Sequence, residues 1–317
     1  MMGTTFPDSI TGSHLPPCKG YRIFDAAKSV FKICDIKAGN LEGTLYEGSG
    51  AKPCKNPATH YAFRTPMEYA FHLKNAGFDF LSIANNHIND FRWKGLHSTI
   101  SALRSNGILY AGIRSTCETT EKTIQGIRVG FCAFAHSPNT PNVNDPKEAE
   151  YLISELKKRC SIVIVSFHGG AEGSACSRIP FTLERFHDEK RGNVHLFART
   201  CIDAGADLVY GHGPHVPRAI ELYKNRLIAY SLGNFCTPYR VSISGKGGMA
   251  PLLVVAIRPN GIFLNGKIFS FIQVRGKGPQ PDSEQQAAKE IKRLTELDFP
   301  STPLIISEEG DIFRKKQ

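Results

Sequence analysis

An α/β fold is predicted for this chain of 317 residues from two features of its sequence. Up to about residue 210, short apolar runs alternate with segments that have helical spacing and helix caps, which is typical of strands connected by helices in one sheet. From residue 226 onward, apolar runs follow one another with no helix between them. They predict antiparallel hairpins, and therefore a second sheet packed on the first.

The composition is that of an ordinary globular protein, with 41% hydrophobic and 21% charged residues, and the length allows a large core. No run reaches the roughly 18 apolar residues of a membrane-spanning helix, and the first residues lack the basic and apolar regions of a signal peptide. Nine cysteines without a CxxC pair indicate neither a zinc knuckle nor a disulfide framework.

The net charge of +10 favours anionic partners such as phosphate esters or acidic polymers. The basic residues are scattered, and the sequence has no nucleic-acid recognition motif. We therefore expect no nucleic-acid partner.

In the first third of the chain, a helix is expected near residues 24–31, and the following run, 31–45, is a candidate strand that ends in the turn Gly39-Asn40-Leu41-Glu42-Gly43. A second helix is predicted over residues 65–77, with Thr65 as N-cap, Glu68 completing a capping box and Gly77 at the C-terminal end.

The next strand, residues 78–84, leads directly into Asn86, His87 and Asp90. An amide, an imidazole and a carboxylate thus follow one strand end. His87 and Asp90 are three residues apart, a spacing at which the acid can orient the ring.

Further strands and helices continue the alternation. A helix is predicted over 96–106, a strand over 128–135, and a helix from Asp145 to about residue 159. The β-branched and aromatic run 161–167 is then a strand that ends in His168 and, four residues later, Glu172.

After a helix over 193–204, the apolar run 206–210 predicts a buried strand, and the glycines and proline behind it predict a loop that carries His212 and His215. Beyond it we expect strands over 226–230, 252–257 and 267–274, with a turn at Pro259-Asn260-Gly261. An amphipathic helix over 283–297 and an irregular, charged end complete the prediction.

Four strand-like runs therefore end in side chains that can bind metal, and parallel strands of one sheet would bring these ends together at one edge. The mixed oxygen and nitrogen donors suit Mn²⁺, Zn²⁺ or Fe²⁺ better than Ca²⁺. Two such ions about 3.5–4 Å apart are the usual arrangement for phosphoester hydrolysis, and Glu42 is the candidate for a carboxylate that bridges them.

Five segments together resemble a known family: GNLEG, ANNHINDF, SFHGG, GADLVYGHGPHVPRAIELY and LIAYSLGNF. They resemble the CapA family of bacterial poly-γ-glutamate capsule biosynthesis proteins, within the calcineurin-like metallophosphoesterase superfamily. The resemblance spans residues 24–257 and implies a four-layer αββα sandwich with a metal site at one sheet edge. It implies a family domain over 1–279, with a helix and tail over 280–317, and an extracytoplasmic or membrane-associated location.

The resemblance also implies roles for individual residues. His87 is the catalytic imidazole and Asp90 its orienting partner, while Glu172 and Asn234 are candidate substrate contacts. The implied metal ligands, for one or two ions, are Glu42, Asn86, His168, His212 and His215. Members of the family open with a strand that ends in Gly-Asp, and the aspartate of this pair is a metal ligand. The first residues of this chain resemble the family segment that follows the Gly-Asp pair. We therefore expect the opening strand and its aspartate to be missing.

Two functions are compatible with this resemblance. The first is a divalent-metal hydrolase acting on a phosphoester or on an amide of γ-linked polyglutamate, with capsule-synthesis membrane proteins as partners. The second is a non-catalytic component of capsule assembly that binds an anionic polymer through its basic surface.

Overall fold

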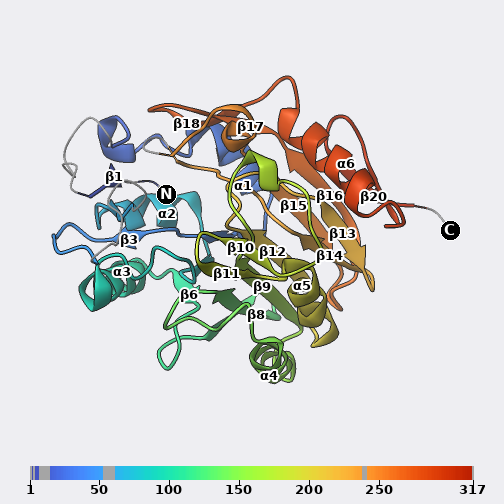
Figure 1. Cartoon of the computed structure of the whole chain (residues 1–317), viewed down its shortest axis with the longest axis horizontal. Coiled ribbons are helices and arrows are strands. Elements are labelled where there is room, and N and C mark those ends of the chain that lie inside the picture. The colour runs from blue at the N-terminus through green and yellow to red at the C-terminus, as the bar shows by residue number, and fades with distance from the viewer. Residues whose placement is uncertain (1, 3, 7–14, 53–60, 238–240, 316–317) are drawn as a thin grey trace.

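Two layers of β-sheet lie between two layers of helices in the computed structural model, which describes residues 2, 4–6, 15–52, 61–237 and 241–315 (Figure 1). Three clusters of buried hydrophobic side chains separate the layers, one between the sheets and one under each helical layer. The predicted α/β class and four-layer sandwich are confirmed.

The larger sheet has six strands in the order β13-β14-β12-β9-β8-β7. Its inner strands run parallel to one another, and the two edge strands pair antiparallel. Nearly all residues of β8 and β9 are buried, which explains why these two strands have almost continuous apolar sequences. The strands are β7 (Thr119–Ile124), β8 (Ile127–Ala135), β9 (Ile162–His168), β12 (Leu208–His212), β13 (Ile220–Tyr223) and β14 (Arg226–Ala229).

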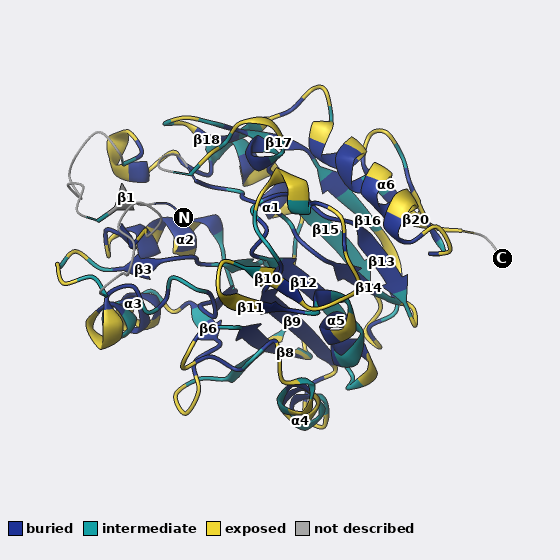
Figure 2. Cartoon of the chain, viewed as in Figure 1, coloured by how far each residue is buried: buried dark blue, intermediate teal, exposed yellow. Residues whose placement is uncertain are grey.

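Helices α4 (Pro146–Lys157) and α5 (Val194–Asp203) cover the outer face of this sheet. Both begin at side chains that cap them: Asp145 accepts a hydrogen bond from the backbone N–H of Glu148, and Asn193 from that of Leu196. Figure 2 shows that each helix turns a buried face to the sheet and an exposed face to solvent. The helices predicted at these positions are confirmed.

The second sheet layer consists of two separate pieces. One is parallel, in the order β2-β5-β6, and the other antiparallel, in the order β15-β16-β20-β19. The strands are β2 (Ala38–Asn40), β5 (Phe80–Ser82), β6 (Leu109–Ala111), β15 (Leu252–Ile257), β16 (Phe263–Phe269), β19 (Leu304–Ile306) and β20 (Asp311–Arg314).

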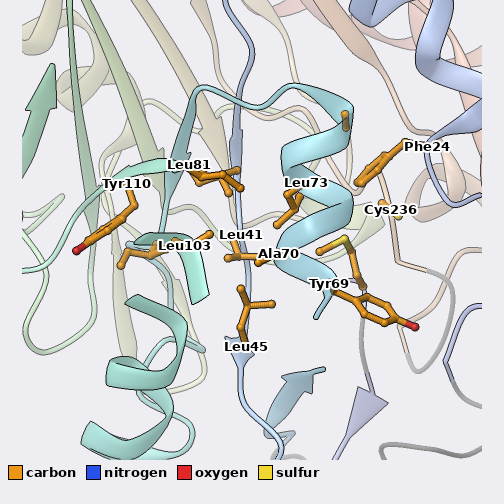
Figure 3. Close-up of a cluster of buried hydrophobic side chains, with 14 of the residues drawn as sticks. Phe24, Leu41, Leu45, Tyr69, Ala70, Leu73, Leu81, Leu103, Tyr110 and Cys236 are labelled. Atoms are coloured by element: carbon orange, nitrogen blue, oxygen red, sulfur yellow. The ribbon is translucent and has the colours of Figure 1, made fainter. Parts of the chain in front are cut away.

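The outer face of β2-β5-β6 is covered by α1 (Lys28–Lys32), α2 (Tyr69–Ala76) and α3 (Arg92–Ser105). Figure 3 shows Leu73 of α2 on the side of the helix that faces Leu41 and Leu81.

Helix α6 (Gln286–Asp298) packs against β13 and β16. Short elements complete the fold: β1 (Thr4–Thr5), β3 (Thr44–Leu45), β4 (Phe63–Thr65), β10 (Glu184–Phe186), β11 (Glu189–Gly192), β17 (Phe271–Val274) and β18 (Gly278–Pro281).

A largely apolar groove of about 730 Å³ separates the two pieces of the second sheet layer, and residues of β2 and β15 line it. Among the described residues, β2 pairs only with β5, and β15 pairs only with β16. One end of the groove contains Glu42, His212 and Asn234. The groove therefore reaches the predicted metal site.

The predicted helix over 65–77 is shorter at its N-terminus, because Thr65 belongs to β4. The backbone carbonyl of Thr65 accepts a hydrogen bond from the N–H of Tyr46, and Thr65 pairs with Leu45, so it cannot also begin a helix. Helix α2 starts at Tyr69 without a side-chain cap, and the predicted capping box is wrong. Gly77 does end the helix, with a positive φ of 84°.

Four further predictions need correction. The strand expected within residues 31–45 is two short strands, Ala38–Asn40 and Thr44–Leu45, because α1 extends to Lys32 and residues 33–37 form a turn and irregular structure. The strand near 226–230 pairs in parallel with β12 and belongs to the larger sheet, and the run 267–274 is divided between β16 and β17. The prediction of an irregular C-terminal end is also wrong, since β19 and β20 extend the second sheet layer.

The hairpin predicted around Pro259-Asn260-Gly261 is confirmed by the antiparallel pairing of β15 and β16. In the described part of the chain, the helices are all too short or too polar to span a bilayer.

Candidate metal centre

The predicted site residues follow the carboxyl ends of four strands, as the sequence indicates, but these strands belong to two sheets rather than one. Glu42 comes two residues after β2, and Asn86 and His87 lie in the turn after β5. His168 and His212 are the last residues of the neighbouring parallel strands β9 and β12, where they pair in register. The two sheet layers are stacked, so their strand ends meet at one edge of the sandwich.

Glu42 is at the centre of this arrangement. Its Oε1 lies 3.5 Å from Nε2 of His215, and its Oε2 lies 4.0 Å from Nδ1 of His168. Both distances are too long for a hydrogen bond. Two donors that bind one ion at about 2.1 Å in a tetrahedral arrangement are about 3.4 Å apart, so the shorter distance is near that of two ligands of one cation.

Several buried polar atoms of this cluster have no hydrogen-bond partner among the described residues. These atoms are Oε1 of Glu42, Oδ1 of Asn86, both ring nitrogens of His168 and Nδ1 of His212. A buried polar group without a partner costs about 1–3 kcal/mol, and His168 is only 1% exposed. An arrangement of unpartnered oxygen and nitrogen donors is what a divalent cation of the Mn²⁺, Fe²⁺ or Zn²⁺ type requires.

The electrostatics of these groups agree with that donor set. Burial lowers the pKa of His168 well below its ordinary value and lowers the pKa of His212 to about 4, so both rings are neutral at pH 7. Burial alone would raise the pKa of Glu42, but the imidazoles of His215, His168 and His87 outweigh it, and the pKa of Glu42 is lowered. The Glu42 carboxylate anion and the neutral rings of His168 and His212 are in the protonation states that bind metal.

As the side chains stand, no group of three or more His, Cys, Asp or Glu residues in the described part of the chain is arranged to hold a metal ion. The nearest approach to such a group is Glu42 with His215 at 3.5 Å and with His168 at 4.0 Å. The residue types fit a cation, and the separations would have to shorten by a few tenths of an ångström around it.

His87 and Asp90 are in direct contact, as their spacing predicts. Nδ1 of His87 donates to Oδ2 of Asp90 at 2.8 Å, and Asp90 also accepts from the backbone N–H of Phe63 and from Nζ of Lys52. Burial opposes the charge on each partner, yet their attraction raises the pKa of His87 and lowers the pKa of Asp90. With Nδ1 engaged, Nε2 is the nitrogen left to exchange a proton with a bound molecule.

The two predicted substrate contacts lie on either side of His215. Oε2 of Glu172 is 3.9 Å from Nε2 of His215, and its Oε1 accepts from Arg191 at 2.9 Å. Asn234 is buried, and its side chain bonds to the ring and backbone of His215.

Three cations near the site were not singled out from the sequence. Lys52 contacts Asp90, Arg191 contacts Glu172 and Glu189, and the buried Arg218 binds Glu184 with both terminal nitrogens. Arg191 and Lys52 lie in ordinary charged stretches with no metal-binding or glycine-rich pattern around them, so nothing local identifies them. Arg218 is three residues after His215, within a segment that the sequence did single out.

The family model described as bacterial capsule synthesis protein PGA_cap matches residues 1–239. The chain belongs to this family. Among PGA_cap relatives, the PGA biosynthesis protein CapA of Bacillus subtilis is 31% identical over 67% of this chain and 56% of its own length. The capsule biosynthesis protein CapA of Bacillus anthracis is 28% identical over 67% of this chain and 53% of its own length, so the chain spans about half the length of these relatives.

Among solved structures, a phosphatase from Mycoplasma pneumoniae is 14% identical, with a TM-score of 0.48, over 81% of this chain and 90% of that protein. A putative 5'-nucleotidase from Staphylococcus aureus is 13% identical, with a TM-score of 0.42, over 72% and 43%.

Proposed function

We propose that this PGA_cap protein is a divalent-metal hydrolase that acts in the synthesis of a capsule or of poly-γ-glutamate. The observation that carries the proposal is the convergence of Glu42, His168, His212 and His215 from separate strands, with buried donor atoms that have no partner among the described residues. The capsule role comes from the printed names of the relatives.

The proposed metal ligands are Glu42, Asn86, His168, His212 and His215, and Mn²⁺, Fe²⁺ or Zn²⁺ suits their donors. One or two such ions, when bound, would supply Lewis acidity for the attack of water on a phosphoester, or on an amide of γ-linked polyglutamate. Glu42 is the only carboxylate among these ligands and approaches two of the imidazoles, so it is the candidate bridge.

His87 is the proposed proton donor to the leaving group. Asp90 holds it through Nδ1, so Nε2 is free to transfer the proton, and Lys52 and the N–H of Phe63 hold Asp90 in turn. The ring of Phe63 packs edge-on against the imidazole of His87, with 4.5 Å between the ring centroids, and this contact limits the orientations of the imidazole. Glu172 lies close enough to His215 to contact a substrate bound at that side of the site.

The first test is the metal content of the purified protein by elemental analysis, after incubation with Mn²⁺ and Zn²⁺. We expect near-stoichiometric metal in the wild type and its loss when His212→Ala and His215→Ala are combined. His97→Ala, a histidine of α3 beside Trp93, is the matched control and should keep the metal. Turnover of an aryl phosphodiester or phosphomonoester with Mn²⁺ should then disappear in His87→Ala without loss of metal.

Two observations support a second candidate, a non-catalytic component of capsule assembly. The net charge is +10, and the described residues contain no closed metal-binding group. This protein would bind poly-γ-glutamate in the absence of metal, with an affinity that falls as salt is added. Metal-free wild type that shows such binding and no turnover would decide for this candidate.

A further inference from the structure

The loop that carries His215 holds this residue in an unusual backbone conformation. Its φ is +59°, in the left-handed region that residues with a side chain seldom adopt, and it follows Gly213 and Pro214 directly. Such a conformation costs of order 1 kcal/mol and persists only where surrounding contacts impose it. Two hydrogen bonds join this residue to Asn234, nineteen residues further along the chain, and the N–H of Gly173 binds the carbonyl of Pro214 next to it.

The orientation of the Asn234 amide follows from its neighbours. Its Nδ2 lies 3.2 Å from the backbone carbonyl of His215 and 3.4 Å from that of Gly247. Carbonyl oxygens can only accept hydrogen bonds, so the NH₂ group must face them. The Oδ1 atom must then face the other way, where it lies 2.8 Å from Nδ1 of His215.

The amide orientation determines the proton position on the imidazole. Because Oδ1 of Asn234 can only accept, Nδ1 of His215 must donate, and the neutral ring carries its lone pair on Nε2. That lone pair is directed toward two carboxylates, with Glu42 Oε1 at 3.5 Å and Glu172 Oε2 at 3.9 Å. A lone pair at this position can bind a divalent cation, whereas a proton on Nε2 would donate to one of these carboxylates instead.

We propose that Asn234 is the positioning residue of this site: it holds His215 in the Nδ1–H tautomer and so presents the Nε2 lone pair on the side of Glu42, where a divalent cation would be held. The identity of the cation rests on the proposed function, whereas the tautomer does not. Because the amide of Asn234 is already engaged on both sides, this role replaces the substrate contact that the resemblance implied.

The segment that presents Asn234 is itself firmly held. The hydroxyl of Ser231 donates to the carbonyl of Val216 and accepts from the backbone N–H of Gly233. A Cβ on Gly233, whose φ is +59°, would lie 3.2 Å from backbone atoms of Val216 and Pro217. Ser231 and Gly233 therefore let the Asn234 segment lie directly against the His215 loop.

The test is the protonation pattern of His215 in metal-free protein labelled with ¹⁵N-histidine, read from long-range ¹H–¹⁵N correlation spectra above pH 7.5. His215→Ala assigns the signal. We expect a protonated Nδ1 and an unprotonated Nε2 in the wild type. Asn234→Asp keeps an oxygen acceptor and should keep this pattern, Asn234→Leu should lose it, and Asn106→Ala, a half-buried amide at the end of α3, should leave it unchanged.

Titration calorimetry with Zn²⁺ supplies the second readout. Asn234→Leu should weaken binding about 10- to 100-fold, the usual effect of removing a group that orients a ligand, and Asn234→Asp should restore most of the affinity. A wild-type ring protonated on Nε2, or on both nitrogens, overturns the proposal, as does a tautomer unchanged in Asn234→Leu. If the predicted tautomer is found but Zn²⁺ does not bind the wild type, the positioning role stands and the proposed metal function fails.

Discussion

Replacing Arg218 by methionine should destabilise the protein by about 3–5 kcal/mol, because it would leave a carboxylate buried without its cation. Arg218 is fully buried and Glu184 is 6% exposed. The guanidinium donates to both carboxylate oxygens, at 2.8 and 2.7 Å, and Nε donates to the carbonyl of Cys176 at 2.9 Å. Methionine has a similar length but supplies none of these hydrogen bonds.

The measurement is urea unfolding of Arg218→Met, Glu184→Gln and the double variant. With an m-value of about 3 kcal/mol/M, a loss of about 3–5 kcal/mol lowers the midpoint by about 1 to 1.7 M. The double variant removes both charges and should cost several kcal/mol less than the sum of the single variants. The side-chain amide that Glu184→Gln introduces would still accept from the N–H of Ala171, as the Glu184 carboxylate does now.

Arg114→Met is the matched control, because Arg114 forms a similar two-point pair with Glu148 but is 41% exposed. It should cost no more than about 1 kcal/mol. The reasoning would be refuted if Arg218→Met cost as little as this control, or if the two single effects were additive.

Three further predictions concern the site and the core. Mn²⁺ at about 100 times its dissociation constant should raise the free energy of unfolding of the wild type by about 2.7 kcal/mol, measured by thermal unfolding. An equal increase in the free energy of unfolding of Glu42→Gln would exclude Glu42 as a ligand. Burial lowers the pKa of His195, so the unfolded chain binds the extra proton and wild-type stability should fall as the pH drops below about 6.5. Thermal melts of His195→Phe at pH 7.5 and 5.5 should show a smaller fall, because His168 and His212, whose pKa values burial also lowers, still contribute; an identical fall would contradict the assignment. Gly211→Ala should cost about 1–3 kcal/mol in urea unfolding, because its Cβ would lie 2.3 Å from the ring of Phe167 and 2.5 Å from the backbone carbonyl oxygen of Tyr230. An unchanged midpoint would show that both neighbours move aside at little cost.

Strands β8, β9 and β12 of the larger sheet could be predicted because their sequences are apolar and lie next to capped helices, whereas β7 and β13 were not predicted and β14 was expected in the second sheet. The caps at Asp145 and Asn193 form as expected. The convergence of the site residues could be predicted for the same reason, since a residue at the end of a parallel strand has a known place in the fold. The direct contact of His87 with Asp90 follows from a spacing of three residues in a turn.

Other features depend on contacts between distant segments, which no local pattern encodes. Thr65 has the local sequence of a helix cap but pairs with Leu45 in a sheet. The C-terminal residues 304–314 are charged and irregular in sequence, yet they include β20, which pairs with β16. In this pairing Asp311 lies opposite Lys267, which is 44 residues earlier in the chain. The role of Asn234 at His215 likewise requires knowing that two loops nineteen residues apart lie against each other.

The groove between β2 and β15 has a consequence for handling the protein. An open strand edge beside apolar walls is a template on which another chain can add a strand, which leads to aggregation. The groove is also lined by Lys37 and Arg258 and by the ion pair of Lys267 with Asp311, and these charged groups make it costly for an apolar strand of a second molecule to dock there. We expect these charges to oppose self-association, so conditions that screen them, such as concentrated salt, should be avoided during refolding and concentration.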